Sequence, residues 1–287
     1  MQLGKVGVWW SGSWQVDGDG PVDVAAELES LGFGAIWSTG GFEPGLRPRF
    51  GRLLSSTSRI VVASGIVSVW STPAVEIANA FAGLEREHPG RFLLGLGASH
   101  APVVENYSRP FSHVVGFLDD LDALSKTATS VVPSRRILAA LGPKMLELAA
   151  SRSAGAHPYF VPVEHTAQAR EILGTGPLLA PELTVVLESE APRAREVART
   201  FTAGYLSLPN YANNLRSLGF AEDDVHDGGS DRLVDAVVAW GDMDAVVARI
   251  RQHLDAGADH VCIQVLSPSR GFPLNEYRRI AEAVTGL

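Results

Sequence analysis

The sequence is poor in cysteine and in long apolar runs. Its single cysteine, Cys262, excludes an internal disulfide and any cysteine-rich zinc cluster, and one cysteine is typical of a reducing compartment. No apolar run reaches about 18 residues, the length that predicts a membrane span. The first residues also lack the basic segment followed by an apolar core that marks a signal peptide. We therefore expect a cytoplasmic protein without a membrane partner.

Positive charge is also scarce. The chain has 24 Lys and Arg residues against 32 Asp and Glu residues, a net charge of −8. This balance disfavours nucleic acids and anionic membranes as general partners. A small-molecule substrate is the partner that we expect, and a homodimer is the assembly that we consider for the protein itself.

Two groups of catalytic motifs are missing. The eight histidines form no His-Glu-x-x-His motif, and no His-x-His sequence closes the first apolar run, so we expect no metal site. No Gly-x-Ser-x-Gly sequence is present, which disfavours a serine hydrolase.

A repeated join between helices and strands indicates the fold. At Gly32, Gly90, Gly155 and Gly257 a helical pattern ends and a short apolar run follows, which is typical of βα units because glycine readily takes the left-handed conformation that ends a helix. Eight strands are predicted, at residues 5–9, 35–37, 60–67, 92–96, 136–139, 156–160, 183–187 and 260–265. Eight strands alternating with helices over about 250 residues or more predict a (β/α)8 TIM barrel. We expect one α/β domain over residues 1–287 with loop and helix insertions, and an open doubly wound sheet is the alternative.

The turn after the fourth predicted strand contains a candidate site. Residues 95–100 half-resemble a dinucleotide-binding fingerprint, but His100 occupies the place of the third glycine. In a barrel this turn lies at the catalytic C-terminal face, and its small residues would let a flat ring approach the backbone. Those small residues are Gly97, Ala98 and Ser99. His100 is our candidate acid/base group because an imidazole titrates near neutral pH; the alternative is a histidine that only lines the pocket.

Other residues at predicted strand ends complete the candidate site. Gly65 lies inside a predicted strand, which indicates a bulge or a close backbone approach. The segment from Leu141 to Lys144 offers a helix N-terminus with a lysine, which can bind an anion but can equally be a plain helix start. Five tryptophans fall near C-terminal strand ends and would form the walls of an apolar pocket: Trp9, Trp10, Trp14, Trp37 and Trp70. We assign Trp10, Trp70 and His157 to the substrate pocket.

Several segments resemble the bacterial luciferase-like superfamily. The most specific are Arg59–Ile66 and His88–Gly97, and Leu254–Val261 resembles the approach to the family's eighth strand. The resemblance covers nearly the whole chain. Asn210–Leu215 and Gly228–Arg232 resemble an actinobacterial branch usually described as F420-dependent oxidoreductases.

The resemblance implies a (β/α)8 barrel that binds a flavin or the deazaflavin F420 at its C-terminal face. It implies a non-proline cis peptide at Gly65–Ile66, behind the cofactor ring, and it places Gly142–Pro143 near the cofactor phosphate. The sequence departs from many deazaflavin members at the end of strand two, where residues 38–41 replace an Asp-His pair. It also has His100 where some sugar-phosphate-oxidising members carry a glutamate. The expected cofactor contacts are Ser64, Gly65, Ile66, Gly97, Ala98, Ser99, Leu141, Gly142, Pro143 and Lys144.

These observations lead to a functional expectation. We expect an oxidoreductase that transfers a hydride between F420 and a small organic substrate. An FMN-dependent luciferase-like monooxygenase is the alternative within the same class. A non-catalytic flavin- or deazaflavin-binding protein is the alternative from another class, and a barrel hydrolase or lyase is a third.

Overall fold

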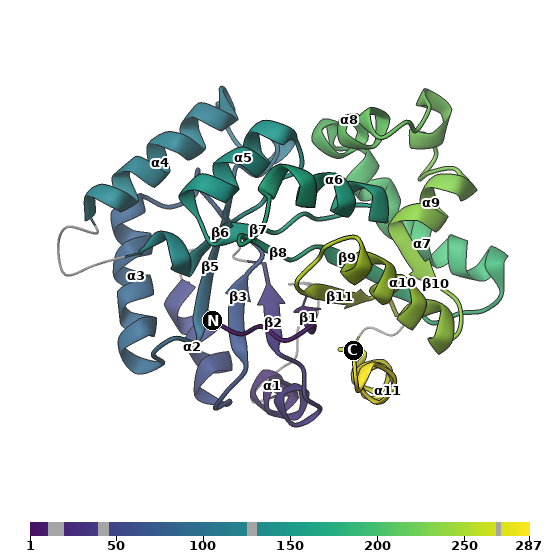
Figure 1. Ribbon diagram of the computed structural model, residues 1–287, viewed down its shortest axis with the longest axis horizontal. Coiled ribbons are helices and arrows are strands. Elements are labelled where there is room, and N and C mark those ends of the chain that lie inside the picture. Colours follow the sequence, from purple (N-terminus) through teal and green to yellow (C-terminus); the bar gives the residue numbers. More distant parts are fainter. Residues whose placement is uncertain (11–19, 40–45, 125–130, 268–270) are drawn as a thin grey trace.

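The strands form one curled sheet in the centre of the molecule (Figure 1). The computed structural model describes residues 1–10, 20–39, 46–124, 131–267 and 271–287. Every strand pairing within these residues is parallel. The strands are β1 (Val6–Trp10), β2 (Ala35–Ser38), β3 (Val61–Ser64), β4 (Val67–Ser68), β5 (Phe92–Gly97), β6 (Arg136–Leu138), β7 (Gly155–Ala156), β8 (Leu178–Leu179), β9 (Glu182–Val186), β10 (Val238–Trp240) and β11 (Val261–Val265).

From β1 to β8 the order of the strands follows the chain, whereas β9 lies between β10 and β11. The order is β10-β9-β11-β1-β2-β3-β5-β6-β7-β8, with β4 paired to β5. β8 and β9 are separated only by Ala180 and Pro181, yet β8 pairs with β7 and β9 pairs with β11. Ala180 N donates to Ala156 O (2.9 Å) and Cys262 N donates to Pro181 O (2.9 Å). Residues 178–186 therefore connect the two sides of the curled sheet.

This arrangement confirms the predicted α/β class and the barrel type, a half-barrel of parallel strands covered by helices. The predicted strand at 60–67 is divided at Gly65–Ile66 into β3 and β4. The strand predicted at 156–160 is shorter because Phe160 has a left-handed φ of 58°, a conformation that an extended strand cannot contain. β8 and β10 were not among the predicted strands.

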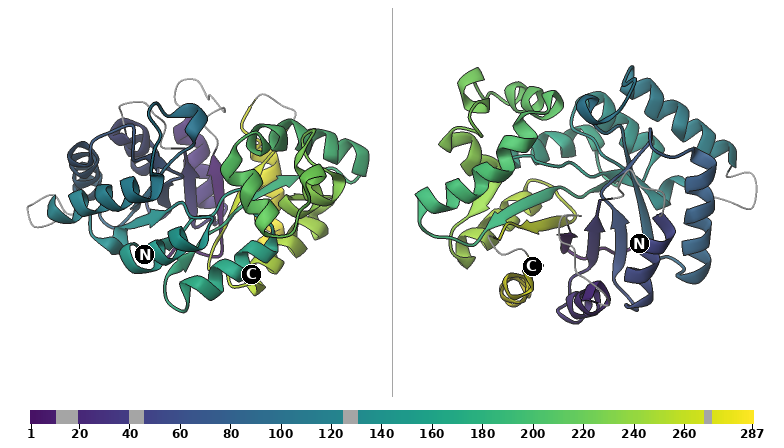
Figure 2. Two further views of the ribbon diagram at one scale, coloured as in Figure 1. Left: turned by 90° about the horizontal axis from the view of Figure 1, so that it is seen from above. Right: turned by 180° about the vertical axis from the view of Figure 1, so that it is seen from behind.

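Eleven helices lie outside the sheet in the described residues (Figure 2). They are α1 (Gly20–Ser30), α2 (Leu46–Ser55), α3 (Ala74–Glu87), α4 (Pro110–Leu124), α5 (Pro143–Arg152), α6 (Val163–Leu173), α7 (Ala191–Leu206), α8 (Pro209–Ser217), α9 (Asp231–Val237), α10 (Met243–Asp255) and α11 (Leu274–Val284). Helix starts are fixed by side-chain caps in places: Asp242 accepts from Ala245 N (2.9 Å) ahead of α10. α7, α8 and α9 lie together beside β9 and β10 (Figure 1), and we refer to these three helices as the helix insertion.

The strands separate two apolar regions because their side chains alternate between faces. Val6, Val8 and Trp10 of β1 belong to the large core between sheet and helices. Trp9 belongs to a smaller core inside the curled sheet, with Trp37 and Cys262 among its members. Since both faces are buried, the strands read as continuous apolar runs rather than as alternating ones. A third core holds α7–α9 against the sheet and includes Phe160 and Tyr211.

Candidate functional site

The C-terminal ends of the strands form the rim at which the sequence predicts the site. A Cβ atom on Gly97 would lie 3.0 Å from the Ile66 side chain and 3.0 Å from Ala139 Cβ. Gly97 is buried, and a side chain there would press on Ile66 and Ala139, so glycine allows these strand ends to pack closely. Gly65 and Ile66 are half-buried beside it, and the peptide between them is cis, as the family resemblance implies.

Trp9 and His157 approach Gly65 from the barrel interior. A Cβ atom on Gly65 would lie 3.1 Å from Trp9 Nε1 and 3.2 Å from His157 Nε2. Trp9 is 3% exposed and His157 is 2% exposed, yet neither nitrogen has a hydrogen-bond partner among the described residues. His157 Nδ1 donates to Ala180 O (2.6 Å), which leaves the lone pair on Nε2, and burial lowers the pKa of His157 to about 4. The two side chains therefore present one N–H donor and one acceptor next to Gly65.

A column of rings fills the barrel beneath this position. The His157 ring stacks on Trp37, with centroids 4.3 Å apart and an interplanar angle of 16°. Trp37 Nε1 donates to His260 Nε2 (3.1 Å), and His260 Nδ1 donates to Gly4 O (2.9 Å) at the opposite end of the barrel. Burial lowers the pKa of His260 to about 4, so the column is uncharged at neutral pH. It supports His157 from below.

His100 lies just beyond β5 on the same rim. Its side chain is half-buried, its Nδ1 is 3.0 Å from Asn210 Oδ1 at the start of α8, and its ring centroid is 5.2 Å from that of Tyr211. Burial lowers the pKa of His100 below its ordinary value of 6.5, and the hydrogen bond that His100 donates to Asn210 raises it in part. A neutral imidazole of this kind can accept a proton at neutral pH.

Aromatic side chains form a wall between the barrel and α7–α8. The Tyr159 hydroxyl donates to Gln264 Oε1 (2.7 Å) and lies 3.0 Å from the Tyr205 hydroxyl. The Tyr159 ring centroid is 5.2 Å from that of Trp9, and burial raises the pKa of Tyr159 well above its ordinary value. These residues were not predicted from the sequence. Gln264 could have been found, because it is a polar residue in an otherwise apolar strand.

Glu182 is another buried polar residue that was not predicted from the sequence. It is 1% exposed and its carboxyl group accepts from Thr184 Oγ1 (2.6 Å) and from Phe160 N (3.3 Å). Burial raises the pKa of Glu182 to about 8, although both hydrogen bonds act in the opposite direction. The side chain is therefore mainly neutral at pH 7. Its bond to Phe160 holds the left-handed turn that follows His157.

Two predicted site residues face away from the rim. Trp10 packs in the core between sheet and helices, with its ring centroid 4.6 Å from that of Phe272. Trp9, rather than Trp10, faces the barrel interior. Ser64 is fully buried, and its hydroxyl donates to Gly95 O (3.0 Å) and accepts from Gly95 N (2.8 Å). Ser64 therefore holds β3 against β5 and does not itself reach the rim.

Trp70 occupies a different part of the rim. It is half-buried just after β4 and stacks on His113, with centroids 3.7 Å apart and an interplanar angle of 5°. Tyr107 lies 5.5 Å from the Trp70 ring centroid and donates to Ser99 O (3.4 Å). Trp70 is thus connected to the turn after β5 through Tyr107. The fifth predicted wall residue, Trp14, lies outside the described residues.

The predicted anion cradle is an exposed helix start. Gly142 is the N-cap of α5, Pro143 is its first residue, and both are exposed together with Lys144. Leu141 is half-buried, and its carbonyl accepts from His165 Nε2 (2.8 Å). The N–H groups of a helix's first turn have no partner within the helix, which suits an anion.

Two arginines lie at the N-terminal end of β6, away from the start of α5. Arg135 and Arg136 come at the start of β6 and not at its end. Arg135 forms an ion pair with Glu85 (2.6 Å), and Arg136 forms one with Asp122 (2.8 Å). Of Arg135, Arg136 and Lys144, only Lys144 follows β6 and lies on the rim side.

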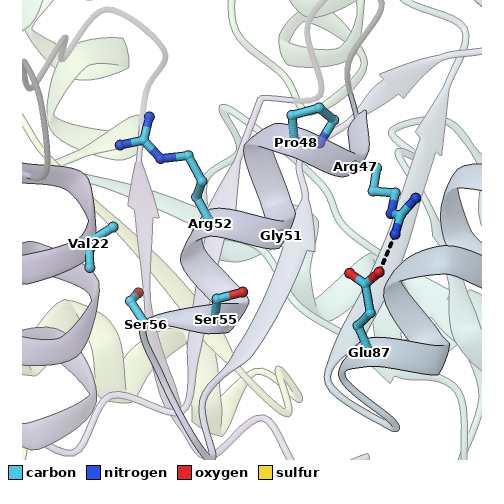
Figure 3. A pocket seen from close by; sticks show the side chains of 8 residues that line it. All are labelled: Val22, Arg47, Pro48, Gly51, Arg52, Ser55, Ser56 and Glu87. Carbon is cyan, nitrogen blue, oxygen red and sulfur yellow. Dashed lines mark hydrogen bonds and ion pairs between the residues drawn. The ribbon is translucent and has the colours of Figure 1, made fainter.

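Two cavities of the described residues lie away from the rim. One of about 520 Å³ is a surface groove along α2, with Arg47, Arg52 and Glu87 in its lining, where Arg47 and Glu87 form an ion pair (Figure 3). The other, of about 540 Å³, lies at the N-terminal end of the barrel next to Lys5 and His260. No group of three or more metal-ligating side chains is found in the described part of the chain. No helix there is long and apolar enough to cross a membrane.

Comparisons with known proteins bear on the family and the fold. Residues 15–130 match the luciferase-like monooxygenase family. That luciferase-like segment contains Gly65, Ile66, Gly97 and His100. No curated protein sequence matches the chain significantly.

Solved structures resemble the chain over its whole length. An F420-dependent secondary alcohol dehydrogenase in complex with an F420-acetone adduct has a TM-score of 0.76 at 16% identity, with 99% of both chains covered. The F420-dependent tetrahydromethanopterin reductase of Methanopyrus kandleri has a TM-score of 0.67 at 15% identity, covering 99% of this chain and 98% of the other. The FMN-bound oxygenating constituent of 3,6-diketocamphane monooxygenase from Pseudomonas putida has a TM-score of 0.70 at 15% identity, covering 98% and 96%. At such identities these similarities establish the luciferase-like fold.

Proposed function

We propose that this protein is a luciferase-like oxidoreductase that transfers a hydride between the deazaflavin F420 and a small organic substrate. The observation that carries the proposal is the half-buried Gly65–Ile66 peptide on the rim, packed closely against Gly97, with the half-buried His100 just beyond β5. A flat ring needs such a surface, and hydride transfer to or from an oxygen-bearing carbon needs a nearby proton acceptor or donor.

The described residues fit a flavin or deazaflavin. Gly65, Ile66, Gly97, Ala98 and Ser99 would contact the ring. The unpartnered Trp9 Nε1 and His157 Nε2 are suited to the carbonyl and N–H groups along the ring edge. The exposed start of α5, from Leu141 to Lys144, would hold the phosphate. When bound, the cofactor supplies the hydride-transferring carbon.

The protein's own residues would orient the substrate and move a proton. His100 Nε2 would take the proton of a substrate hydroxyl, or return it in the opposite direction, because the ring is neutral at neutral pH. Trp70 and His157 would line the substrate pocket. Trp9 would take the place in the pocket wall that we expected for Trp10. Tyr159 and Tyr211 would add an aromatic wall, which favours a substrate with an apolar body.

A second candidate is an FMN-dependent monooxygenase. The similarity of the fold to an FMN-bound monooxygenase supports it. The same rim residues would contact FMN, since flavin and deazaflavin rings have nearly the same shape.

Titration of the purified protein with F420 and with FMN, side by side, tests the proposal. We expect saturable binding of F420 with a lower Kd than that of FMN. Tighter binding of FMN would support the monooxygenase, and binding of neither would overturn both. Binding of F420 without turnover of any reducible or oxidisable substrate in a broad screen would instead support a non-catalytic cofactor-binding protein.

A further inference from the structure

The contact between His100 and Asn210 joins two parts of the chain that are 110 residues apart. His100 follows β5 of the barrel, whereas Asn210 is the second residue of α8 in the helix insertion. Asn210 is exposed, and the next residue, Tyr211, is 7% exposed and packs in the core of the insertion. The insertion is therefore firmly anchored at the point from which the Asn210 side chain reaches the rim.

The hydrogen bond determines which nitrogen of His100 carries the proton. An amide oxygen can only accept, so His100 Nδ1 must donate to Asn210 Oδ1 (3.0 Å). In the neutral ring the lone pair then lies on Nε2, which has no hydrogen-bond partner among the described residues. Without Asn210 either nitrogen could carry the proton.

The surroundings keep the ring neutral. Burial lowers the pKa of His100, and no charged group of the described chain contributes to the shift. The titratable group that faces the ring, Tyr211, is itself neutral because burial raises its pKa well above the ordinary value. The protonation state of His100 thus depends on burial and on one amide.

We propose that Asn210 is a positioning residue that fixes His100 in the tautomer with the proton on Nδ1 and the lone pair on Nε2. Its consequence for catalysis rests on the proposed function, in which His100 Nε2 accepts the substrate proton. The helix insertion then contributes to the reaction through Asn210, without touching the reacting atoms.

Nitrogen-15 chemical shifts of the histidine side chains in the cofactor-free protein test the proposal directly. The His100 signals are assigned by their loss in the His100→Ala variant. We expect the wild-type ring to be neutral at pH 7.5 with the proton on Nδ1, and Asn210→Ala to shift the population toward the other tautomer. Asn210→Asp should raise the pKa of His100 by roughly one to three units, because a carboxylate at this distance favours the imidazolium.

The control is Asn213→Ala, one turn further along the same helix, where the Asn213 side chain bonds Arg216 and not His100. It should leave the His100 shifts and pKa unchanged. A wild-type ring with its proton on Nε2, or shifts that Asn210→Ala leaves unchanged, would overturn the positioning role.

Turnover distinguishes this proposal from the proposed function. If both hold, Asn210→Ala lowers kcat by about 10-fold without changing the Kd of F420, and Asn210→Asp moves the acid limb of the kcat/KM profile to higher pH. If the tautomer shifts as expected but His100→Ala turns over normally, Asn210 still positions His100, and the proton-transfer role of His100 is wrong.

Discussion

Replacing Glu182 with glutamine should change how the stability of the protein depends on pH. Glu182 is 1% exposed and accepts hydrogen bonds from Thr184 and from the Phe160 N–H. Glutamine has nearly the same shape and keeps an acceptor oxygen for Phe160, but it cannot ionise. Any pH dependence that Glu182 contributes should therefore disappear in Glu182→Gln.

The size and the sign of the effect follow from the pKa of this carboxyl group. Burial raises the pKa from 4.5 to about 8. In the unfolded chain the group loses its proton near pH 4.5, while in the folded chain it keeps the proton until about pH 8. Because the folded state binds more protons between these values, the free energy of unfolding falls as pH rises through this range. At about 1.4 kcal/mol per pKa unit the total loss is about 5 kcal/mol.

Urea unfolding of both proteins at pH 5 and pH 8.5 measures the effect. Between these two pH values the free energy of unfolding of the wild type should fall by several kcal/mol more than that of Glu182→Gln. This is most of the total loss of about 5 kcal/mol. Glu196→Gln on the exposed face of α7 is the control and should follow the wild type. Identical pH dependence of wild type and Glu182→Gln would show that the carboxyl group is hydrated or ionised in the native state, which would refute the reasoning.

Three further substitutions test the rim. His100→Ala should lower turnover by about 10²–10⁴-fold with little change in the Kd of F420; lost F420 binding with normal turnover per bound site would show a structural role. Lys144→Ala should weaken F420 binding, more at low than at high salt in parallel titrations, and an unchanged Kd would remove Lys144 from the site. Trp9→Phe removes the unpartnered N–H and should raise the Kd of F420 or FMN by about 10-fold, while Trp10→Phe, on the opposite face of β1, should not; equal effects would argue against a contact from Trp9.

Much of the barrel could be predicted because most strands are buried apolar runs and four of them begin at or follow a glycine that ends a helical pattern. Glycine at positions 32 and 257 ends helices with a positive φ, as the sequence indicates. The sequence did not indicate which residues of β1 face the barrel interior and which face the helices. Both faces are buried, so the hydrophobic pattern does not distinguish Trp9 from Trp10.

The rim was predicted only in part, for a similar reason. Gly65, Ile66 and Gly97 could be placed because the sequence around each is specific, and their contacts bring them together. Asn210 and Tyr159 belong to segments whose position against His100 and Trp9 depends on how the insertion packs. Such long-range contacts leave no periodic signal in the sequence. The polar residues in buried strands, Glu182 and Gln264, are the exception, since a polar residue inside an apolar run marks an inward position that needs a partner.

The column of His157, Trp37 and His260 closes the barrel interior between its two ends. These three side chains are 2%, 0% and 0% exposed, and they occupy the axis between the rim and the cavity beside His260. In the described residues the two ends of the barrel are thus separated by close-packed rings and have no channel between them. If the rim is the active site, as we propose, substrate would enter and product would leave through the same opening, and a bound product would block the next substrate. Inhibition by product should therefore be competitive with substrate.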